Sequence, residues 1–229
     1  MNLERLIQKI KKEPEYKFTS RLTTYDIYLI LKSRLIQLIR GLMLKPLIKS
    51  KGIVFLGRRT NILFKHKIRL GRNVIIDDNV LINAFSENGI SFGNNVTISR
   101  DSILICTGCV RRKGIGITIG NNTGLNARCF IGGQGGVKIG DLVIIGPDVK
   151  IFSENHFYSD LKIPIKYQGE IRKGVVIEDN CWIGAGAIIL AGVILGSGTI
   201  VAAGSVVNKS FPTNSIIGGI PAKFIKNRE

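Results

Sequence analysis

The sequence predicts an all-β solenoid, a parallel β-helix of about six or more coils that follows a short helical segment. A small aliphatic residue recurs at every sixth position, without a slip, at Ile177, Ile183, Ile189, Leu195, Val201 and Val207. This period matches neither a 3.6-residue helical turn nor the alternation of a single strand, so each hexad is expected to form one short strand and then turn. With 27 glycines and 7% aromatic residues, the composition also suits short strands and tight turns.

Residues 1–52 are expected to form a basic, partly helical N-terminal segment. Apolar residues have helical spacing from about 25 to 48, and Pro46 is expected to end the helix. One stripe holds Tyr28, Leu31, Leu35, Leu38 and Leu42. Cations interrupt the apolar run well before the roughly 18 residues of a membrane span. Two interpretations remain, a helix that covers the first coils or a basic amphipathic helix on an anionic membrane surface.

Residues 53–210 are expected to form the solenoid. The aliphatic residue of each hexad can be recognised from Leu70 onward. The six-residue spacing holds within groups of three hexads and is interrupted between groups, so 18 residues are expected to make one coil of a triangular prism. Six coils can be counted from Leu70 to Val207. The repeat is interrupted at 83–91, 105–118, 132–138 and 152–176. The last interruption, a loop, is the longest. Because the repeat residues are core, functional residues are expected where the repeat is interrupted.

The formal net charge of +17 is unevenly distributed. Residues 1–72 hold 18 Lys and Arg against 4 Asp and Glu, whereas residues 73–229 hold 15 against 12. A noncatalytic basic solenoid that binds membrane or nucleic acid is therefore an alternative. The cations are not interleaved with stacking aromatics, so no nucleic-acid partner is expected.

Four cysteines are too few and too scattered for a secreted disulfide scaffold, and no signal peptide precedes them. A cytoplasmic location is expected, with peripheral contact at the inner face of the membrane as the alternative that the basic helix suggests. Cys106 and Cys109 form one C-x-x-C without a second pair, so no metal is expected.

Histidine is the main candidate for catalysis. His66 lies between two lysines and is expected to be solvated, whereas His156 opens the longest interruption directly after a completed coil. Imidazole titrates near neutrality, and a rigid prism can hold it against a substrate, so His156 is predicted to be catalytic. Two histidines are too few for a three-imidazole zinc site. The glycine-rich stretch 132–136 lacks the Lys and Ser/Thr of a nucleotide loop and is expected to be a turn.

The hexads and four ordered motifs resemble the hexapeptide-repeat acyltransferases, most closely the branch of galactoside, maltose and xenobiotic O-acetyltransferases. The motifs are Ser153-Glu154-Asn155-His156, Asn180-Cys181-Trp182-Ile183-Gly184, Ala202-Ala203-Gly204-Ser205-Val206-Val207-Asn208-Lys209 and Gly219-Ile220-Pro221-Ala222-Lys223. The resemblance covers about residues 70–226. It implies a left-handed parallel β-helix, a homotrimer and active sites between neighbouring prisms, although the general preference for right-handed crossovers predicts the opposite hand.

The same resemblance implies roles for nine residues. His156 is the general base, and Asn126 is the asparagine on the acceptor side. Acetyl-CoA, the acyl-donor substrate, lies in the groove between subunits, and the residues implied to contact it are Trp182, Gly184, Ala185, Ala203, Lys209, Lys223 and Lys226. The tail at 211–229 completes this site. Gln134 stands where family members often carry an acidic residue, so the identity of the acceptor is left open.

The predicted function is acetyl-CoA-dependent O-acetylation of a sugar hydroxyl, in surface polysaccharide or lipopolysaccharide biosynthesis. His156 would take the hydroxyl proton, a contribution of about 10²–10⁴-fold, and a backbone N–H near Ala185 would stabilise the oxyanion. No nucleophilic Ser or Cys adjoins His156, which favours direct transfer. Amino-sugar N-acetylation and serine or xenobiotic acetylation are the alternatives. Glu154, Asp148 and Asp160 are the candidates for the group that orients the imidazole, and the sequence does not choose among them.

Overall fold

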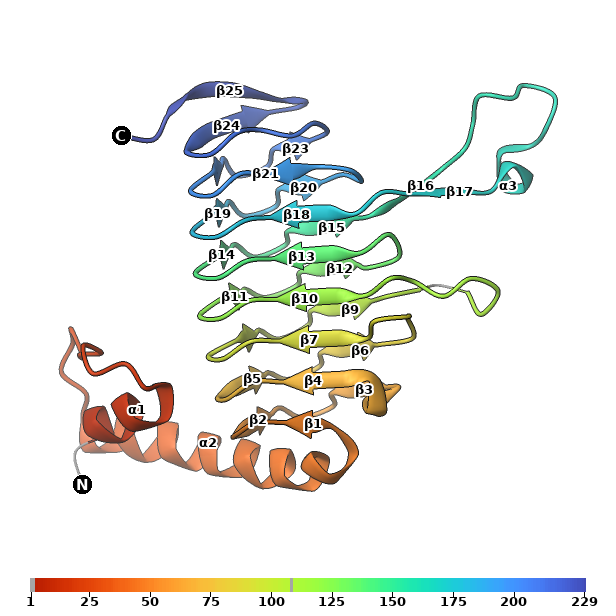
Figure 1. The fold of residues 1–229 in the computed structure, drawn as a ribbon. Helices are drawn as coiled ribbons and strands as arrows, with labels where there is room; N and C mark the ends of the chain where they lie inside the picture. Colours follow the sequence, from red (N-terminus) through yellow and green to blue (C-terminus); the bar gives the residue numbers. More distant parts are fainter. Residues whose placement is uncertain (1–2, 108) are drawn as a thin grey trace.

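The computed structural model describes residues 3–107 and 109–229, which form a three-sided column with two helices at its N-terminal end (Figure 1). The chain runs leftward along the front sheet in Figure 1, passes round the back through two further sheets, and returns at the right one level higher. This path is a left-handed coil. The predicted parallel β-helix and its hand are confirmed, and the general preference for right-handed crossovers does not hold here.

Parallel strands stack in three sheets, named here in the order in which the chain visits them. The first sheet holds β1 (Lys49–Ser50), β4 (Ile68–Leu70), β7 (Ile90–Phe92), β10 (Ile117–Ile119), β13 (Val137–Ile139), β18 (Val175–Ile177) and β21 (Ile194–Leu195). The second holds β2 (Val54–Leu56), β5 (Val74–Ile76), β8 (Thr97–Ile98), β11 (Gly124–Leu125), β14 (Ile144–Ile145), β19 (Trp182–Ile183) and β22 (Ile200–Val201). The third holds β3 (Asn61–Leu63), β6 (Leu81–Asn83), β9 (Ile103–Ile105), β12 (Phe130–Gly132), β15 (Lys150–Phe152), β20 (Ile188–Ile189) and β23 (Val206–Val207).

These strands make seven complete coils in the described part of the chain, one more than the hexad pattern showed from Leu70 onward. The extra coil, β1 to β3, precedes Leu70 and buries Ile48, Val54 and Ile62. From Leu70 onward, the apolar residue at the head of each hexad points inward. The row inside the second sheet is at most 1% exposed and consists of Ile76, Ile98, Leu125, Ile145, Ile183 and Val201. Burial of these rows is the main stabilising contribution to the column.

The three edges of the column differ in their turns. The first edge, between the first and second sheets, repeats a short turn with one residue at positive φ, at Asn73, Asn95, Asn122, Leu142, Asn180 and Asn214. Asparagine tolerates this conformation better than most residues. Beside it, a side-chain ladder links the coils, as Asn121 Oδ1 accepts from Asn94 N at 2.8 Å and Asp141 Oδ1 accepts from Asn121 N at 2.6 Å. The second edge joins the second and third sheets, and the third edge returns to the first sheet.

Two helices cover the start of the column, α1 (Leu3–Lys11) and α2 (Thr24–Leu44). Thr23 Oγ1 accepts from Asp26 N at 3.1 Å and caps α2, and a short 3-10 turn (Lys45–Leu47) with Pro46 follows its end. α2 packs against β2 so closely that a Cβ at Gly41 would lie 1.9 Å from the Val54 carbonyl oxygen. Leu44 and Ile48 join the core of the column.

The apolar stripe predicted for this helix is not the face that packs. Leu35 is 58% and Leu42 is 56% exposed, whereas Gly41 and Leu44 are buried. The packed face also uses Gln37, which donates to Asp77 on the column at 3.5 Å. The predicted stripe is wrong as a guide to packing. The packed face depends on a glycine, which lets two backbones approach closely but does not stand out in a pattern of apolar residues.

The chain leaves the column twice. Between β15 and β18 it forms an arm from β16 (Glu154–His156), α3 (Ile165–Gln168) and β17 (Glu170–Arg172), which projects from the third edge (Figure 1). After β23 the hairpin of β24 (Ser215–Gly219) and β25 (Ala222–Asn227) extends the second sheet. Among the described helices, none is both long and apolar enough to span a bilayer.

Candidate functional site

Seven of the nine predicted site residues lie on one side of the column. They occupy the second sheet, its end or the second edge, and are Asn126, Trp182, Gly184, Ala185, Ala203, Lys223 and Lys226. The other two, His156 and Lys209, leave the column at the third edge. One copy of the chain therefore does not bring His156 to the other predicted residues.

Trp182 stands on the outer face of the second sheet. Its partners in the parallel register are Ile144 below and Ile200 above. Trp182 is 54% and Ile144 is 59% exposed, so the two form an apolar strip open to a ligand or to another chain.

The upper second edge lacks bulky side chains. Gly184 has a structural reason for being glycine, because a Cβ there would lie 2.5 Å from Ala203 N in the next coil. Gly186 and Gly204, both at positive φ, have open space on the Cβ side. Together with Ala185 and Ala203 they leave a shallow passage along the edge.

Two backbone amides along this passage, those of Ala185 and Ala203, have no protein acceptor among the described residues. Gly184 N donates to Val201 O and Gly186 N donates to Pro147 O, each at 2.8 Å. One coil lower, the position equivalent to Ala185 is Pro147, which has no N–H. The Ala185 amide is therefore available to a developing negative charge on a bound group.

The lower second edge is charged. Arg128 and Asp148 form a two-pronged ion pair, with 2.8 Å from Nε to Oδ1 and 2.7 Å from Nη2 to Oδ2. Hydrogen bonding to Arg128 lowers the pKa of Asp148. Asn126, in the same coil as Arg128 and one coil below Asp148, is exposed, and its Nδ2 donates to Ile145 O at 3.0 Å. The acceptor oxygen of this amide is left for a ligand.

His156 lies on the arm, where β16 pairs antiparallel with β17. Two sets of contacts hold the base of the arm. Ser153, fully buried, accepts from Gly135 N at 2.8 Å and donates to Gly132 O at 2.6 Å. Arg172, with a side chain only 8% exposed, pairs with Glu154 at 2.6 Å. The glycine-rich stretch 132–136 thus anchors the arm as well as turning between coils.

A second loop on the third edge supports the arm. Arg172 donates to the carbonyl oxygens of Lys113, at 2.5 Å, and Arg112, at 3.3 Å. Arg112 in turn donates to Glu170 O at 3.3 Å. The two largest interruptions of the repeat are therefore one connected unit, in which an almost buried cation fixes the ribbon that carries His156.

The three candidates for orienting His156 are all engaged elsewhere. Glu154 is paired with Arg172, Asp148 is paired with Arg128 on another edge, and Asp160 Oδ1 accepts from Lys162 N at 2.8 Å. The residue directly opposite His156 in the ribbon is Glu170. Opposite residues in an antiparallel pair have Cβ atoms about 4.5–5.5 Å apart on one face. Sequence reasoning missed Glu170 because no motif reveals the register of β16 and β17.

The predicted lysines divide between two places. Lys223 and Lys226 lie on β25, at the C-terminal end of the second sheet above Ala203, and Lys226 is 3.9 Å from Glu229. Lys209 lies at the third edge, 5.6 Å from the Phe211 ring centroid. His66, predicted to be solvated, is exposed.

Three of the four thiols are buried and unsuited to chemistry, whereas Cys109 is exposed. Cys106, Cys129 and Cys181 are buried, and burial raises the pKa of Cys106 and of Cys129 to about 11. Within residues 3–107 and 109–229, no cluster of three or more His, Cys, Asp or Glu side chains could hold a metal ion.

Heights along the column relate His156 to the second edge. Asn126 belongs to the coil of β10 to β12, Gly184 and Ala185 to that of β18 to β20, and the arm leaves from the coil between them, β13 to β15. Adjacent coils are about 4.8 Å apart. A second copy standing alongside in the same orientation and at the same height would bring the base of its arm to the level between Asn126 and Ala185.

Comparisons with known proteins agree with the repeat. Residues 174–209 match the family model described as bacterial transferase hexapeptide (six repeats). A probable acetyltransferase of Mycobacterium tuberculosis is 31% identical over 196 residues, 84% of this chain and 56% of that protein. Galactoside O-acetyltransferase of Lactococcus lactis is 34% identical over 86 residues, 37% of this chain and 40% of that protein. The chain spans about half the length of the curated relatives it matches.

A solved structure shares the fold. It is AntD, an N-acyltransferase from Bacillus cereus in complex with dTDP and 3-hydroxybutyryl-CoA, with a TM-score of 0.55 and 21% identity over 83% of this chain and 88% of that one. At this identity the likeness shows a common fold and no shared substrate.

Proposed function

The chain belongs to the hexapeptide-repeat acyltransferase family, and on that premise we propose that it is an acetyl-CoA-dependent acyltransferase that O-acetylates a sugar in surface polysaccharide or lipopolysaccharide biosynthesis. The observation that carries the proposal is the height of the coil from which the His156 arm leaves, between the coils of Asn126 and Ala185. A base at that height would stand between an acceptor below and a thioester above.

In this scheme the donor lies along the second edge. The pantetheine arm passes Ala203 and the exposed ring of Trp182, and the phosphates at the nucleotide end meet Lys223 and Lys226. The small side chains of the upper edge leave room for it. Lys209, on the third edge, would reach the same donor only from the neighbouring copy.

Transfer then needs one base and one oxyanion donor. His156 accepts the hydroxyl proton as the sugar oxygen attacks the thioester carbonyl, and the N–H of Ala185 stabilises the negative charge on the carbonyl oxygen. The carbon–sulfur bond then breaks, the acetyl group remains on the sugar oxygen, and the CoA thiolate takes up the proton. No covalent enzyme intermediate is required.

The arm also supports assembly as a homotrimer with sites between copies. Large apolar side chains on it are exposed in a single chain, with Leu161 at 98%, Tyr167 at 74% and Tyr158 at 72%. The strip of Ile144 and Trp182 is a second exposed apolar surface, on another side of the column. Contiguous exposed apolar surface of this kind marks interaction sites.

The proposed base is tested by following CoA release with a panel of sugars for wild type and His156→Ala. We expect a loss of about 10²–10⁴-fold in kcat with unchanged thermal stability, since the imidazole is exposed. His66→Ala is the matched control, because His66 is also exposed but lies far below in η2 (Lys65–Lys67). Unchanged turnover in His156→Ala would rule out the assigned base.

Amino-sugar N-acylation is a second candidate, because a general base at His156 and an oxyanion donor at Ala185 would serve an amine acceptor as well as a hydroxyl. The two candidates differ in the acceptor atom. A matched pair of sugars that carry an amine or a hydroxyl at one carbon separates them, because transfer to the amine alone would favour N-acylation.

We also propose that the enzyme works in the cytoplasm at the inner face of the membrane, resting on it through α2. The N-terminal 72 residues hold 18 Lys and Arg against 4 Asp and Glu, and the outer face of α2 exposes Leu35, Leu42 and Met43. Such a face suits an anionic lipid surface. Leu35→Ser with Met43→Ser should reduce pelleting with anionic vesicles, and equal pelleting by wild type and variant would refute the contact.

A further inference from the structure

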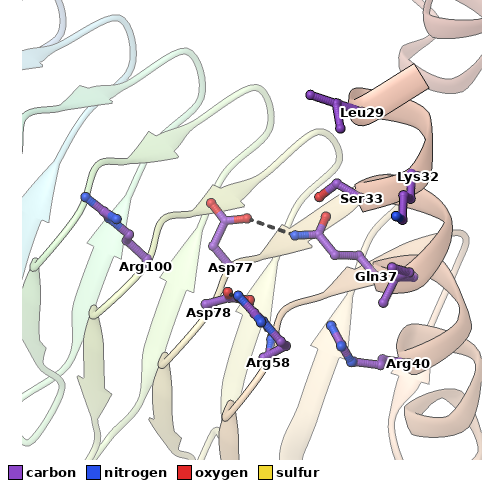
Figure 2. A pocket seen from close by; sticks show the side chains of 10 residues that line it. Leu29, Lys32, Ser33, Gln37, Arg40, Arg58, Asp77, Asp78 and Arg100 are labelled. Atoms are coloured by element: carbon purple, nitrogen blue, oxygen red, sulfur yellow. Dashed lines mark hydrogen bonds and ion pairs between the residues drawn. The ribbon is translucent and has the colours of Figure 1, made fainter. Parts of the chain in front are cut away.

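A groove of about 500 Å³ lies between α2 and the lowest three coils, at the second edge (Figure 2). The helix contributes Lys32, Gln37 and Arg40, and the column contributes Arg58, Asp77, Asp78 and Arg100. Four cations and two carboxylates therefore face a single space.

The carboxylates are already engaged. Asp78 accepts from Arg58 N at 2.6 Å and from Arg58 Nε at 3.3 Å, and Asp77 accepts from Gln37 at 3.5 Å, the dashed contact in Figure 2. Arg34 fixes Gln37 from the other side, at 2.7 Å from Nη1 to Oε1. The groove is thus a built junction of helix and column.

The other three cations of the groove make few contacts with acidic side chains. Arg40 is half-buried and forms no ion pair within the described residues, and Arg100 has only a 4.0 Å contact with Asp101. Lys32 lies over the Tyr28 ring, with its Nζ 5.7 Å from the ring centroid, and has no ion pair in the described part of the chain. Guanidinium groups bind phosphate oxygens in a fixed fork, so Arg40 and Arg100, the second with only a single 4.0 Å ion pair, together favour a phosphate-bearing ligand.

The groove lies in line with the acceptor position. Ser99, which precedes Arg100, is directly below Asn126 in the stack, since Ser99 N donates to Leu125 O. Asp77 is one coil lower and Arg58 begins one coil below that. At about 4.8 Å per coil, the groove begins one coil beneath Asn126 and runs down for roughly 10 Å.

We propose that this groove binds the phosphate groups of the acceptor, so that the substrate is a sugar linked to a phosphate or diphosphate. This inference rests on the proposed function, in which Asn126 marks the acceptor end. The sugar would lie at Asn126, with the donor above it and its phosphates below, between Arg100 and Arg40. Two sources share this chemistry, a nucleoside diphosphate and a polyprenyl phosphate, and the outer face of α2 beside the groove is compatible with the second.

The test titrates inorganic pyrophosphate into the full-length protein saturated with CoA, so that the donor site is already filled. The variants are Arg40→Gln, Arg100→Gln and the charge-preserving Arg40→Lys. Arg72→Gln is the matched control, since Arg72 is an exposed arginine of the same coil as Asp77 but on the first edge. Uridine diphosphate and vesicles containing polyprenyl phosphate then replace pyrophosphate to distinguish the two sources.

We expect each Gln variant to weaken pyrophosphate binding by about tenfold, Arg40→Lys to weaken it less, and Arg72→Gln to leave it unchanged. Equal binding by wild type and the Gln variants, or no binding once CoA is present, would overturn the proposal. Acetyl-CoA affinity, measured on the same proteins in the absence of CoA, should not change in any variant. Failure of acetyl-CoA to bind wild type would instead refute the proposed function, so the two failures are distinguishable.

Discussion

The first and third edges of the column are built on the same hexads but have opposite characters. The first edge repeats one short turn from coil to coil, and its side chains form a ladder in which Asn94, Asn121 and Asp141 each bond to the coil above. The third edge varies from a few residues to the arm at 153–174, and its contacts join one loop to another. The comparison teaches that stability and function are separated by edge in this molecule.

The largest effect that this comparison predicts is on activity, from a change at the third edge. Arg172→Ala removes the almost buried cation that pairs with Glu154 and bonds to two carbonyl groups. We expect the arm to lose its fixed position and the rate of CoA release to fall at least about 100-fold, since misplacement of a catalytic group by about 1 Å has this cost. Kinetics and limited proteolysis of the arm measure both effects.

The thermal midpoint of the column should change little in Arg172→Ala. Arg172→Lys keeps the charge but not the fork and should recover only part of the activity. If the arm instead stays resistant to protease and active without Arg172, the third edge is held by other contacts.

A smaller effect, on stability, is predicted at the first edge. Asn121→Ala removes the acceptor for two donors of Asn94 and the donor to Asp141. The expected cost is about 1–2 kcal/mol in the free energy of unfolding, because water replaces part of these bonds at a half-buried site. Ser91→Ala, at an exposed hydroxyl pair on the first sheet, is the control that should be neutral. Kinetic constants should be unchanged, and a strong loss of activity in Asn121→Ala would contradict the separation of the two edges.

The smallest predicted effect is a gain. Leu142 has a φ of 59° and is 56% exposed, in the turn position where other coils carry asparagine. A non-glycine residue with a large side chain is disfavoured in that region. Leu142→Asn should therefore raise the free energy of unfolding by about 0.5–1 kcal/mol, measured by chemical denaturation. A loss of stability would mean that Leu142 is retained for a contact with another copy.

The coils from Leu70 onward could be predicted from the sequence, because each inward aliphatic residue is a local consequence of the hexad. The first coil could be predicted only in part: the expected solenoid begins at residue 53, and the position equivalent to Leu70 in this coil is Ser50, a polar residue that hides the pattern. The handedness followed from resemblance alone, because hydropathy is the same for a coil of either hand.

For the candidate site, the motifs supply candidate residues but not their arrangement. Motifs identified His156, Asn126 and Trp182, yet only the order of sheets shows that His156 leaves from a different edge. Glu170 opposite His156 depends on the register of the arm, and the Arg172 contacts join residues about 60 positions apart. Such long-range pairings leave no periodic trace in one sequence.

The most direct test of the shared site is complementation between two inactive variants, His156→Ala and Asn126→Ala, co-assembled from equal amounts. In a trimer with sites between copies, each mixed trimer regains one intact site, so about a quarter of wild-type activity is expected from random mixing. Each variant assembled alone should stay inactive. If the mixture is no more active than its components, His156 and Asn126 do not meet across an interface, and the account of the site is wrong.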